Sequence, residues 1–224
     1  PKLTQNLWYA TPDNGLAAMI YAPSSVECEV GGRRVKIAER TNYPFEESVI
    51  FEISVENRGA HTFPLHLRVP EWSKSVRLSV NGNSVVIEPQ NGVVVVNNKW
   101  RTGDVVKIEF DAEIAVSYWY DCGVAVERGP LLYALKMEEK WVHHDVEPSE
   151  QRLLGKEYYE VYSSSPWNWG FVKKELNEDK LSQTFTFERK DDVADYPWNL
   201  ESAPMSIKAR VHEMTNWKKY NGSI

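Results

Sequence analysis

The feature that most constrains the fold is a two-residue alternation of apolar and polar side chains, repeated in short runs. Alternation of this kind places every second side chain on one face of a β-strand, whereas a helix needs a period near 3.6 residues. No stretch of about twelve residues carries a sustained helical stripe. Short strands separated by turn residues are typical of a sandwich or barrel. The predicted strands of the first half are Gly15 to Ala22, Val26 to Val30, Arg33 to Ile37, Val49 to Val55, Phe63 to Val69, Val76 to Val80, Val85 to Ile87, Val93 to Val96 and Val105 to Phe110.

Two dipeptides predict tight hairpins. Gly31-Gly32 and Asn81-Gly82 each separate two such runs. Both central residues of a type I′ turn need a positive φ, which glycine and asparagine adopt most readily. The flanking strands are therefore expected to pair antiparallel at both places.

The pattern changes near Ser117, which predicts a first β-sandwich domain over residues 1–117 and a second over 118–224. The fold class is all-β: two consecutive antiparallel, jelly-roll-like β-sandwich domains with little helix. Residues 138–155 and 191–204 are polar and carry prolines, so both predict loops, and residues 173–180 predict one helical turn. The strands expected in this half are Ile114 to Tyr118, Val124 to Val126, Leu131 to Leu135, Tyr158 to Tyr162, Phe171-Val172, Leu181 to Phe187 and Met205 to Val211.

Composition limits the classes of partner. Of 224 residues, 42% are hydrophobic, which is enough for a packed core, and the formal net charge is −6. Basic residues are scattered rather than clustered, so we expect no nucleic-acid partner. No apolar run reaches the roughly 18 residues of a membrane span, so we expect no membrane partner. The chain starts at Pro1 rather than at Met, which predicts a longer parent protein that carries any targeting signal upstream.

The metal-ligating residue types are few. Cys28 and Cys122 lie far apart in sequence and favour two free structural thiols over a disulfide, although the sequence alone leaves pairing open. His143-His144 beside Asp145 offers two imidazoles in a polar stretch, where a surface pair is favoured over part of a metal site. We therefore assign no metal site.

No catalytic set is visible in the sequence. A glycosidase usually places two carboxyl groups across one bond. The acidic pairs here are adjacent in sequence or lie in polar stretches, as solvated surface groups do. There is no Gly-x-Ser-x-Gly elbow, Walker motif or dinucleotide fingerprint, so no catalytic residue is assigned. The acidic pairs considered are Glu46-Glu47, Glu138-Glu139 and Asp191-Asp192.

The tryptophans near loops are the residues that suggest a ligand-binding site. Exposed rings of Trp167, Trp169 and Trp198 could stack on the apolar faces of sugars, which gives a carbohydrate-binding hypothesis. The favoured interpretation is that they anchor a core or an interface, as Trp and Tyr do in β-sandwiches. The segment Pro166 to Gly170 predicts a rigid docking loop.

Seven segments, in order along nearly the whole chain, together resemble the region that follows the helical barrel in β-L-arabinofuranosidase-type glycoside hydrolases of family 127 and relatives, a region formerly classed as a domain of unknown function. The segments are Gly15 to Ser24, Thr41 to Phe45, Leu67 to Trp72, Val80 to Gly82, Trp100 to Asp104, Val124 to Tyr133 and Ser165 to Trp169.

The resemblance implies a non-catalytic, accessory region of a carbohydrate-degrading hydrolase. The expected partners are the (α/α)6 catalytic barrel of the same polypeptide and a plant-type glycan. In the family a cysteine acts as nucleophile on a zinc ion and a glutamate as acid/base, all within that barrel. No such role is carried onto Cys28, Cys122 or any glutamate here, so this chain is expected to be inactive by itself and to hold no cofactor. Zinc is expected only in the catalytic domain, and a bacterial parent, periplasmic or secreted, fits this family.

Further expectations concern packing. Arg128, Gly129 and Pro130, together with Trp167, are expected to mediate inter-domain packing, with Arg128 paired to a carboxylate. Trp72 and Trp100 are expected to close the first core. The chain ends at residues 221–224 without the family's final Pro-Tyr-Gly strand, which predicts an exposed sheet edge and self-association. The alternatives to an accessory region are a carbohydrate-binding module and a β-sandwich interaction protein.

Overall fold

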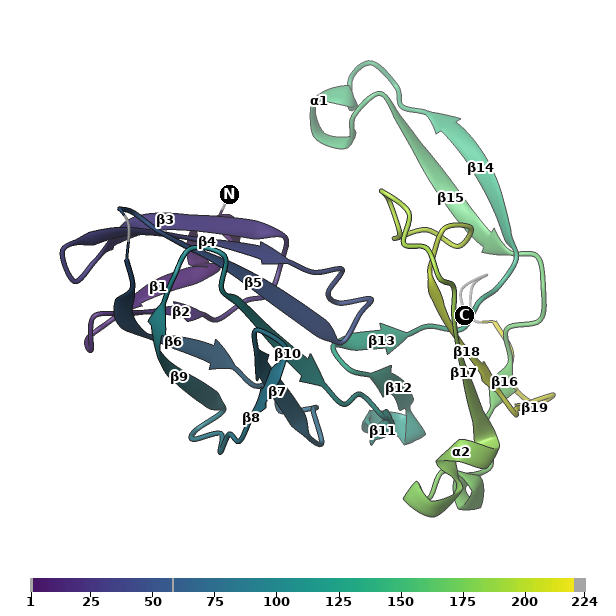
Figure 1. Cartoon of the computed structure of the whole chain (residues 1–224). Helices are drawn as coiled ribbons and strands as arrows, with labels where there is room; N and C mark the ends of the chain where they lie inside the picture. The colour runs from purple at the N-terminus through teal and green to yellow at the C-terminus, as the bar shows by residue number, and fades with distance from the viewer. Residues whose placement is uncertain (1, 58, 220–224) are drawn as a thin grey trace. The chain divides into compact units, whose positions relative to one another are not determined.

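The computed structural model describes residues 2–57 and 59–219 (Figure 1). Nineteen strands dominate the described chain, and its two α-helices, α1 (Gln151–Leu154) and α2 (Leu181–Thr184), are single turns. The all-β prediction is confirmed. Short 3-10 turns complete the inventory: η1 (Thr4–Asn6), η2 (Tyr120–Cys122), η3 (Lys173–Glu175) and η4 (Glu178–Lys180).

The chain separates into two compact units, which we describe one at a time. The first unit comprises Pro1–Ile114, Glu127–Leu132 and Asp191–Asp195, and the second comprises Ala115–Val126, Tyr133–Lys190 and Tyr196–Ile224. The domain division at residue 117 and the jelly-roll character of the sheets stay predictions.

The first unit is built on two sheets whose apolar faces share one core (Figure 1). One sheet has the order β1-β2-β6-β9: β1 (Trp8–Thr11), β2 (Gly15–Ala18), β6 (His61–Arg68) and β9 (Val93–Trp100). The other has the order β3-β4-β5-β10-β7-β8: β3 (Ser24–Val30), β4 (Arg33–Arg40), β5 (Ser48–Val55), β10 (Val105–Phe110), β7 (Val76–Val80) and β8 (Asn83–Val85).

The alternation of apolar and polar residues in the sequence matches the alternation of buried and more exposed side chains in the strands. Along β5 every second side chain from Val49 to Val55 is buried, and β10 buries every second residue in the same way. Trp100 is fully buried, and its indole N–H donates to the carbonyl of Phe63 at 2.8 Å. Trp72 is half-buried and meets Phe110 edge to face at 5.7 Å. The prediction that Trp72 and Trp100 close the first core is confirmed.

Both predicted hairpin turns are present. Gly31 and Gly32 have φ of 53° and 79°, and Asn81 and Gly82 have φ of 52° and 79°. These positive values are those of a type I′ turn. The turns join β3 to β4 and β7 to β8 in antiparallel pairs.

One pairing of the first unit is parallel, that of β2 with β6. The two strands approach closely at Gly15, where a Cβ atom would lie only 2.6 Å from the Pro64 ring. Glycine is therefore needed at the start of β2, which is also the start of the first family-like segment.

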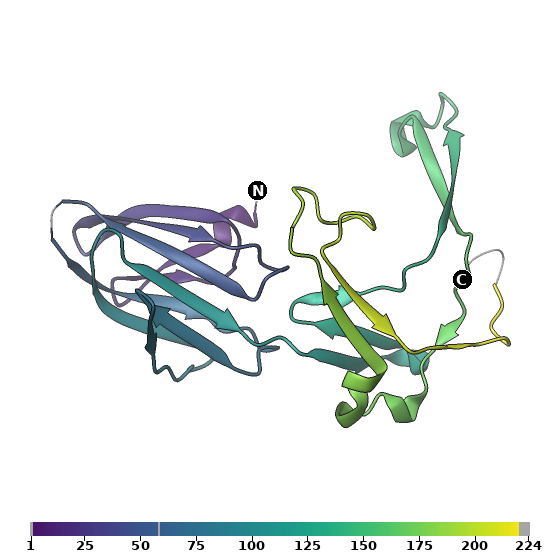
Figure 2. The same ribbon diagram turned by 45° about the vertical axis from the view of Figure 1, so that its right-hand side comes forward.

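The second unit consists mainly of small sheets. Strand β14 (Glu139–Asp145) pairs with β15 (Glu157–Ser163), β16 (Trp169–Gly170) with β19 (His212–Glu213), and β17 (Phe185–Arg189) with β18 (Met205–Ala209). A three-stranded sheet of β11 (Ile114–Tyr118), β12 (Val124–Arg128) and β13 (Leu131–Tyr133) has residues in both units. Figures 1 and 2 show no other strand beside β14 or β15. No helix in the described part of the chain is long and apolar enough to cross a membrane.

Three local predictions are wrong. Residues 138–155 are not a loop, because β14 occupies 139–145, where exposed and half-buried side chains alternate. Residues 181–184 form α2 rather than the start of a strand, and the strand follows at Phe185. A strand expected at Phe171-Val172 lies two residues earlier, at Trp169–Gly170. The chain end at 221–224, on which the exposed-edge prediction rested, lies outside the described residues.

Candidate functional site

Two of the family-like segments meet in the first unit, although the residues that join them, Asn81 and Asp104, are 23 positions apart in sequence. The Asn81 side chain donates to Asp104 at 3.0 Å and accepts from the Val105 backbone N–H at 2.8 Å. The other oxygen of Asp104 accepts from the Arg101 N–H at 2.7 Å. The β7–β8 turn is thereby fixed to the β9–β10 turn, so both segments have a structural role.

A threonine of the same segment reaches across to β5. The Thr102 hydroxyl accepts from the Val55 N–H at 2.9 Å and lies 3.0 Å from the Val55 carbonyl. One side chain thereby satisfies the backbone groups at the end of a strand, as buried polar groups require.

Arg68, in another family-like segment, ties the chain after β2 to β6. Its Nε donates to the Met19 carbonyl at 2.6 Å, and its guanidinium lies 5.8 Å from the centre of the Tyr21 ring. The Tyr21 hydroxyl donates to the Arg68 carbonyl at 2.5 Å, and burial raises the pKa of this phenol.

Arg128 pairs with a carboxylate, as the sequence predicts. The partner is Glu47, and both side chains are mostly buried and belong to the first unit. Gly129 has a φ of 58°, and a Cβ atom there would lie 3.5 Å from Ala112 and 3.8 Å from Trp72. This segment therefore packs beside Trp72. A role of Arg128, Gly129, Pro130 and Trp167 between the two units stays a prediction.

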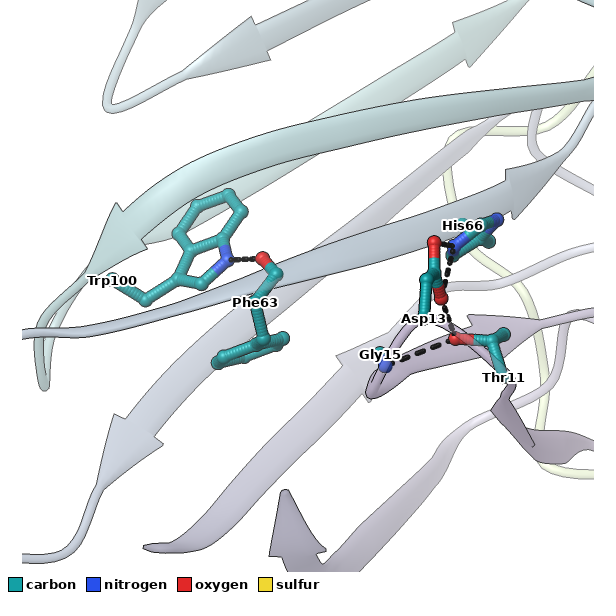
Figure 3. Close-up of polar contacts among 6 residues, drawn as sticks. All are labelled: Thr11, Asp13, Gly15, Phe63, His66 and Trp100. Atoms are coloured by element: carbon teal, nitrogen blue, oxygen red, sulfur yellow. Dashed lines mark hydrogen bonds and ion pairs between the residues drawn. The ribbon is translucent and has the colours of Figure 1, made fainter. Parts of the chain in front are cut away.

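A carboxylate, an imidazole and a hydroxyl come together at the β1–β2 turn (Figure 3). Asp13 contacts the His66 Nε2 at 3.0 and 3.3 Å and accepts from the Thr11 hydroxyl, which also accepts from the Gly15 N–H at 3.0 Å. The Thr11 hydrogen bond, followed by His66, lowers the pKa of Asp13. Asp13 accepts from the Thr11 hydroxyl, but its lowered pKa makes it a weak base, so the hydroxyl is not activated as a nucleophile. The cluster anchors the turn to β6.

Glu39 is the buried acid of the first unit, and the sequence analysis did not single it out. It is 3% exposed at the end of β4 and accepts from the Ser24 hydroxyl at 2.9 Å and the Ala22 N–H at 3.1 Å. The Trp8 indole donates to Ser24 at 3.0 Å. Burial raises the pKa of Glu39 to about 7, against the opposing effect of the Ser24 and Ala22 hydrogen bonds. The alternation that places it on the inner face could have revealed it.

The three candidate sugar-binding tryptophans are placed differently. Trp167 is half-buried, and its ring lies parallel to Trp217, with centres 6.4 Å apart and planes at 19°. The Trp169 indole donates to the Pro166 carbonyl at 3.0 Å. Trp198 is 61% exposed in the loop after residue 190. The structure thus joins Trp167 to Trp217, a ring outside the predicted set.

The loop that carries Trp167 docks onto the segment that carries Trp217. The Asn168 side chain donates to the Met214 carbonyl at 3.1 Å, and the Met214 N–H donates to the Asn168 carbonyl at 2.6 Å. A Cβ atom at Gly170 would lie 2.9 Å from the Met214 side chain, so a larger residue there would have to displace that side chain. The rigid docking loop predicted for residues 166–170 therefore has its partner within the second unit.

The two adjacent histidines pair separately with glutamates. His143 contacts Glu157 at 2.9 Å and His144 contacts Glu160 at 2.8 Å, on opposite faces of the β14–β15 hairpin. Over the described residues there is no group of three or more His, Cys, Asp or Glu that could hold a metal ion. The residues present therefore do not fit the zinc that the family resemblance implies for its catalytic domain. Cys28 and Cys122 are free thiols, and burial raises the pKa of Cys28.

The geometry of the first unit agrees with a family comparison. Residues 15–112 match the family model described as "Beta-L-arabinofuranosidase, GH127 middle domain". Residues 15–112 are a GH127-related β-sandwich region. The match covers less than half of the chain and runs from the start of β2 to just past β10, which are the strands that enclose the core. No curated protein matches the chain.

One solved structure has the same fold. A GH127 β-L-arabinofuranosidase from Geobacillus stearothermophilus T6 superposes with a TM-score of 0.53 and 22% identity, over 92% of this chain and 32% of that one. The chain thus spans about a third of that protein. A structure described as a glycoside hydrolase (TM-score 0.49, 22% identity, 71% of this chain and 30% of that one) and a GH127 β-arabinofuranosidase (0.49, 20%, 73% and 30%) resemble it less.

The contacts described above give the family-like segments physical roles. Asn81, Asp104, Thr102 and Arg68 fasten turns and strand ends of one sandwich, and Arg128 binds Glu47 beside it. The segments that carry the resemblance thus stabilise the sandwich through these contacts.

Proposed function

We propose that this chain is an accessory β-sandwich region of a β-L-arabinofuranosidase-type glycoside hydrolase, without turnover of its own. In this proposal it supports an (α/α)6 catalytic barrel elsewhere in the same polypeptide, where zinc and the reacting residues would lie. The carrying observation is the match of residues 15–112 to the GH127 middle domain. The hydrogen bonds of the family-like segments support it, because they stabilise the sandwich.

The test compares the chain of residues 1–224 with its longer parent polypeptide. We expect no hydrolysis of an aryl β-L-arabinofuranoside by the chain, with or without added zinc, and hydrolysis by the parent. Loss of activity in the parent after Asp104→Ala, with a lowered melting temperature, would support a stabilising role. Zinc-dependent turnover by the chain alone would overturn the proposal.

A second candidate function is glycan binding, favoured by the parallel Trp167 and Trp217 rings. Trp217 is 47% exposed, and Asn168 and Glu213 beside the pair offer an amide and a carboxylate. Aromatic faces with flanking hydrogen-bonding groups suit the apolar and hydroxylated faces of sugars, as in other concave or flat ligand sites. The ligand class would be an arabinose-containing plant-type glycan.

Calorimetric titration with arabinan and arabinogalactan oligosaccharides tests this candidate. Binding that Trp217→Ala removes, and that Trp119→Ala leaves intact, would support it. Trp119 is the matched control because it is 68% exposed and outside the pair. Absence of heat and of any tryptophan fluorescence change would count against it.

A further inference from the structure

An asparagine followed by glycine is a chemically reactive pair, and it occurs four times in the chain. The backbone nitrogen of the glycine can attack the side-chain amide of the asparagine, because glycine has no Cβ atom to hinder the approach. The structure describes three of the four pairs, and each lies in a turn where the asparagine has a positive φ. The pairs are Asn14-Gly15, Asn81-Gly82, Asn91-Gly92 and Asn221-Gly222, the last of which lies outside the described residues.

The Asn14 pair is restrained at the attacking nitrogen. The Gly15 N–H donates to the Thr11 hydroxyl at 3.0 Å, and Gly15 is buried at the start of β2. A Cβ atom at Gly15 would lie 2.6 Å from the Pro64 ring, so the backbone has no room to close a ring with the preceding side chain. The nitrogen of Gly15 is therefore neither free nor accessible.

The Asn81 pair is restrained at the side chain. Its amide group donates to Asp104 at 3.0 Å and accepts from the Val105 N–H at 2.8 Å. The backbone N–H of Asn81 also donates to the Val105 carbonyl at 2.8 Å. The Asn81 amide must break both side-chain hydrogen bonds before it can turn toward Gly82, so the attack costs the free energy of those bonds.

The Asn91 pair has neither restraint. Gln90 and Val93 exchange two backbone hydrogen bonds, at 2.8 and 3.0 Å, in an isolated bridge. Between them Asn91 and Gly92 have φ of 51° and 74°, as in a type I′ turn. Both turn residues are exposed, and within the described part of the chain neither the Asn91 side chain nor the Gly92 N–H has a hydrogen-bond partner. A turn closed by so few bonds opens locally at low cost, which lets the amide and the nitrogen meet.

We propose that Asn91 is a site of spontaneous deamidation, at which the chain modifies itself with water as the co-reactant. The Gly92 nitrogen forms a bond to the Asn91 Cγ, and its proton goes to the side-chain amide, which leaves as ammonia when the Cγ–Nδ2 bond breaks. Water then adds to either carbonyl of the resulting cyclic succinimide and opens it. Opening at one C–N bond gives aspartate, and opening at the other gives isoaspartate. No electron is transferred in either step.

Both products change the connection between β8 and β9. Each adds a negative charge at residue 91. Isoaspartate also routes the backbone through the former side chain, which lengthens the turn by a methylene group. The Gly92 carbonyl accepts from the Val69 N–H at 2.7 Å, so the longer turn disturbs the contact that joins this turn to the end of β6. The modification goes beyond the accessory function and does not depend on it.

Peptide mass spectrometry of the 224-residue chain, incubated at mildly alkaline pH, tests the proposal. Deamidation replaces NH2 by OH and changes the peptide mass, and an isoaspartyl methyltransferase assay labels the isomerised product. We expect modification about tenfold faster at Asn91 than at Asn81, because the Asn81 amide must first lose two hydrogen bonds. Modification at Asn14 should also be slower than at Asn91. The chain unfolded in guanidinium chloride is the matched control: the folded restraints are absent there, so the three rates should be similar.

Two variants separate the causes. Asp104→Ala releases the Asn81 amide, so it should raise the rate at Asn81 and leave the rate at Asn91 unchanged. Asn91→Gln should remove the modification at residue 91, because the longer side chain closes a ring much more slowly. Equal rates at the three sites of the folded chain would overturn the proposal. So would an Asn91 that stays unmodified in the folded chain while it reacts in the unfolded one.

Discussion

At the scale of single residues, Trp100 is the clearest determinant of stability. Its ring is fully buried and its indole N–H is bonded to Phe63. Trp100→Ala leaves a cavity and an unpaired carbonyl, so we expect a loss of about 3–5 kcal/mol in the free energy of unfolding. Urea unfolding followed by circular dichroism measures it. Trp119→Ala, at an exposed ring, serves as control, and an unchanged midpoint for Trp100→Ala would refute the assignment.

Glu39 is the residue whose ionisation should affect stability. Its folded pKa of about 7 lies above the ordinary value of 4.5, so folding favours the neutral acid. The stability it contributes is complete below about pH 4.5 and is lost as pH rises through about 7. Over that window we expect a decline of about 1–3 kcal/mol from this group.

The isosteric variant isolates this effect. Glu39→Gln cannot ionise. Its amide oxygen can still accept from the Ala22 N–H, and its NH2 group can donate to Ser24, as the hydroxyl of the neutral acid would. Its unfolding free energy should therefore decline less between pH 5 and pH 8 than that of the parent chain, as chemical denaturation at a series of pH values would show. Parallel pH profiles for the two proteins would contradict the assignment.

At the scale of elements, the Asp13 cluster should control the attachment of β1. Asp13→Ala removes the acceptor shared by Thr11 and His66, and the β1–β2 turn loses its link to β6. We expect faster amide hydrogen exchange across β1 (Trp8–Thr11), with β5 unchanged as the internal control. Thr11→Val, which removes only the hydroxyl, should give a smaller increase. Equal protection of β1 in all three proteins would show that the cluster is dispensable.

The elements that the sequence predicts correctly are those with local signals. The Gly31-Gly32 and Asn81-Gly82 turns need positive φ, and the alternating runs beside them bury one face, so these hairpins follow from the chain itself. Strand β14 cannot be recognised from the sequence, because most of its side chains are exposed on both faces and no apolar–polar alternation marks a buried face. The helical turn α2 begins with Leu181 and precedes a strand, and an apolar run this short does not distinguish the two.

The candidate site was predictable only in part. The Arg128 pairing with a carboxylate follows from the residue type, but its partner Glu47 lies 81 residues away in sequence. The partnership of Trp167 with Trp217 likewise depends on β16 pairing with β19, a contact between distant segments. Residue type therefore indicates which side chains need a partner, and only the tertiary fold shows which residue that partner is.

At the scale of the whole molecule, the family-like segments fall into two groups. Most of them fasten the first sandwich, through Arg68, Asn81, Asp104 and Arg128. The Trp167 segment instead docks within the second unit, onto Met214. The family-like segments thus take part in two separate sets of structural contacts.

The first unit includes residues beyond the boundary expected at 117. Residues 127–132 carry Arg128, bonded to Glu47, and Gly129, packed near Trp72. We therefore expect a polypeptide of residues 1–132 to melt at a higher temperature than one of residues 1–117. Removing one member of a largely buried charged pair costs about 1–3 kcal/mol.

The contribution of the ion pair can be separated from that of chain length. Arg128→Met in the 1–132 polypeptide keeps the aliphatic packing and removes the charge, so it should lose much of the gain in melting temperature. Glu47→Gln should lower the melting temperature of the 1–132 polypeptide more than that of the 1–117 polypeptide, which has no Arg128. Equal melting temperatures of the two polypeptides, measured by calorimetry, would mean that residues 127–132 do not stabilise the sandwich and that the boundary at 117 is sufficient.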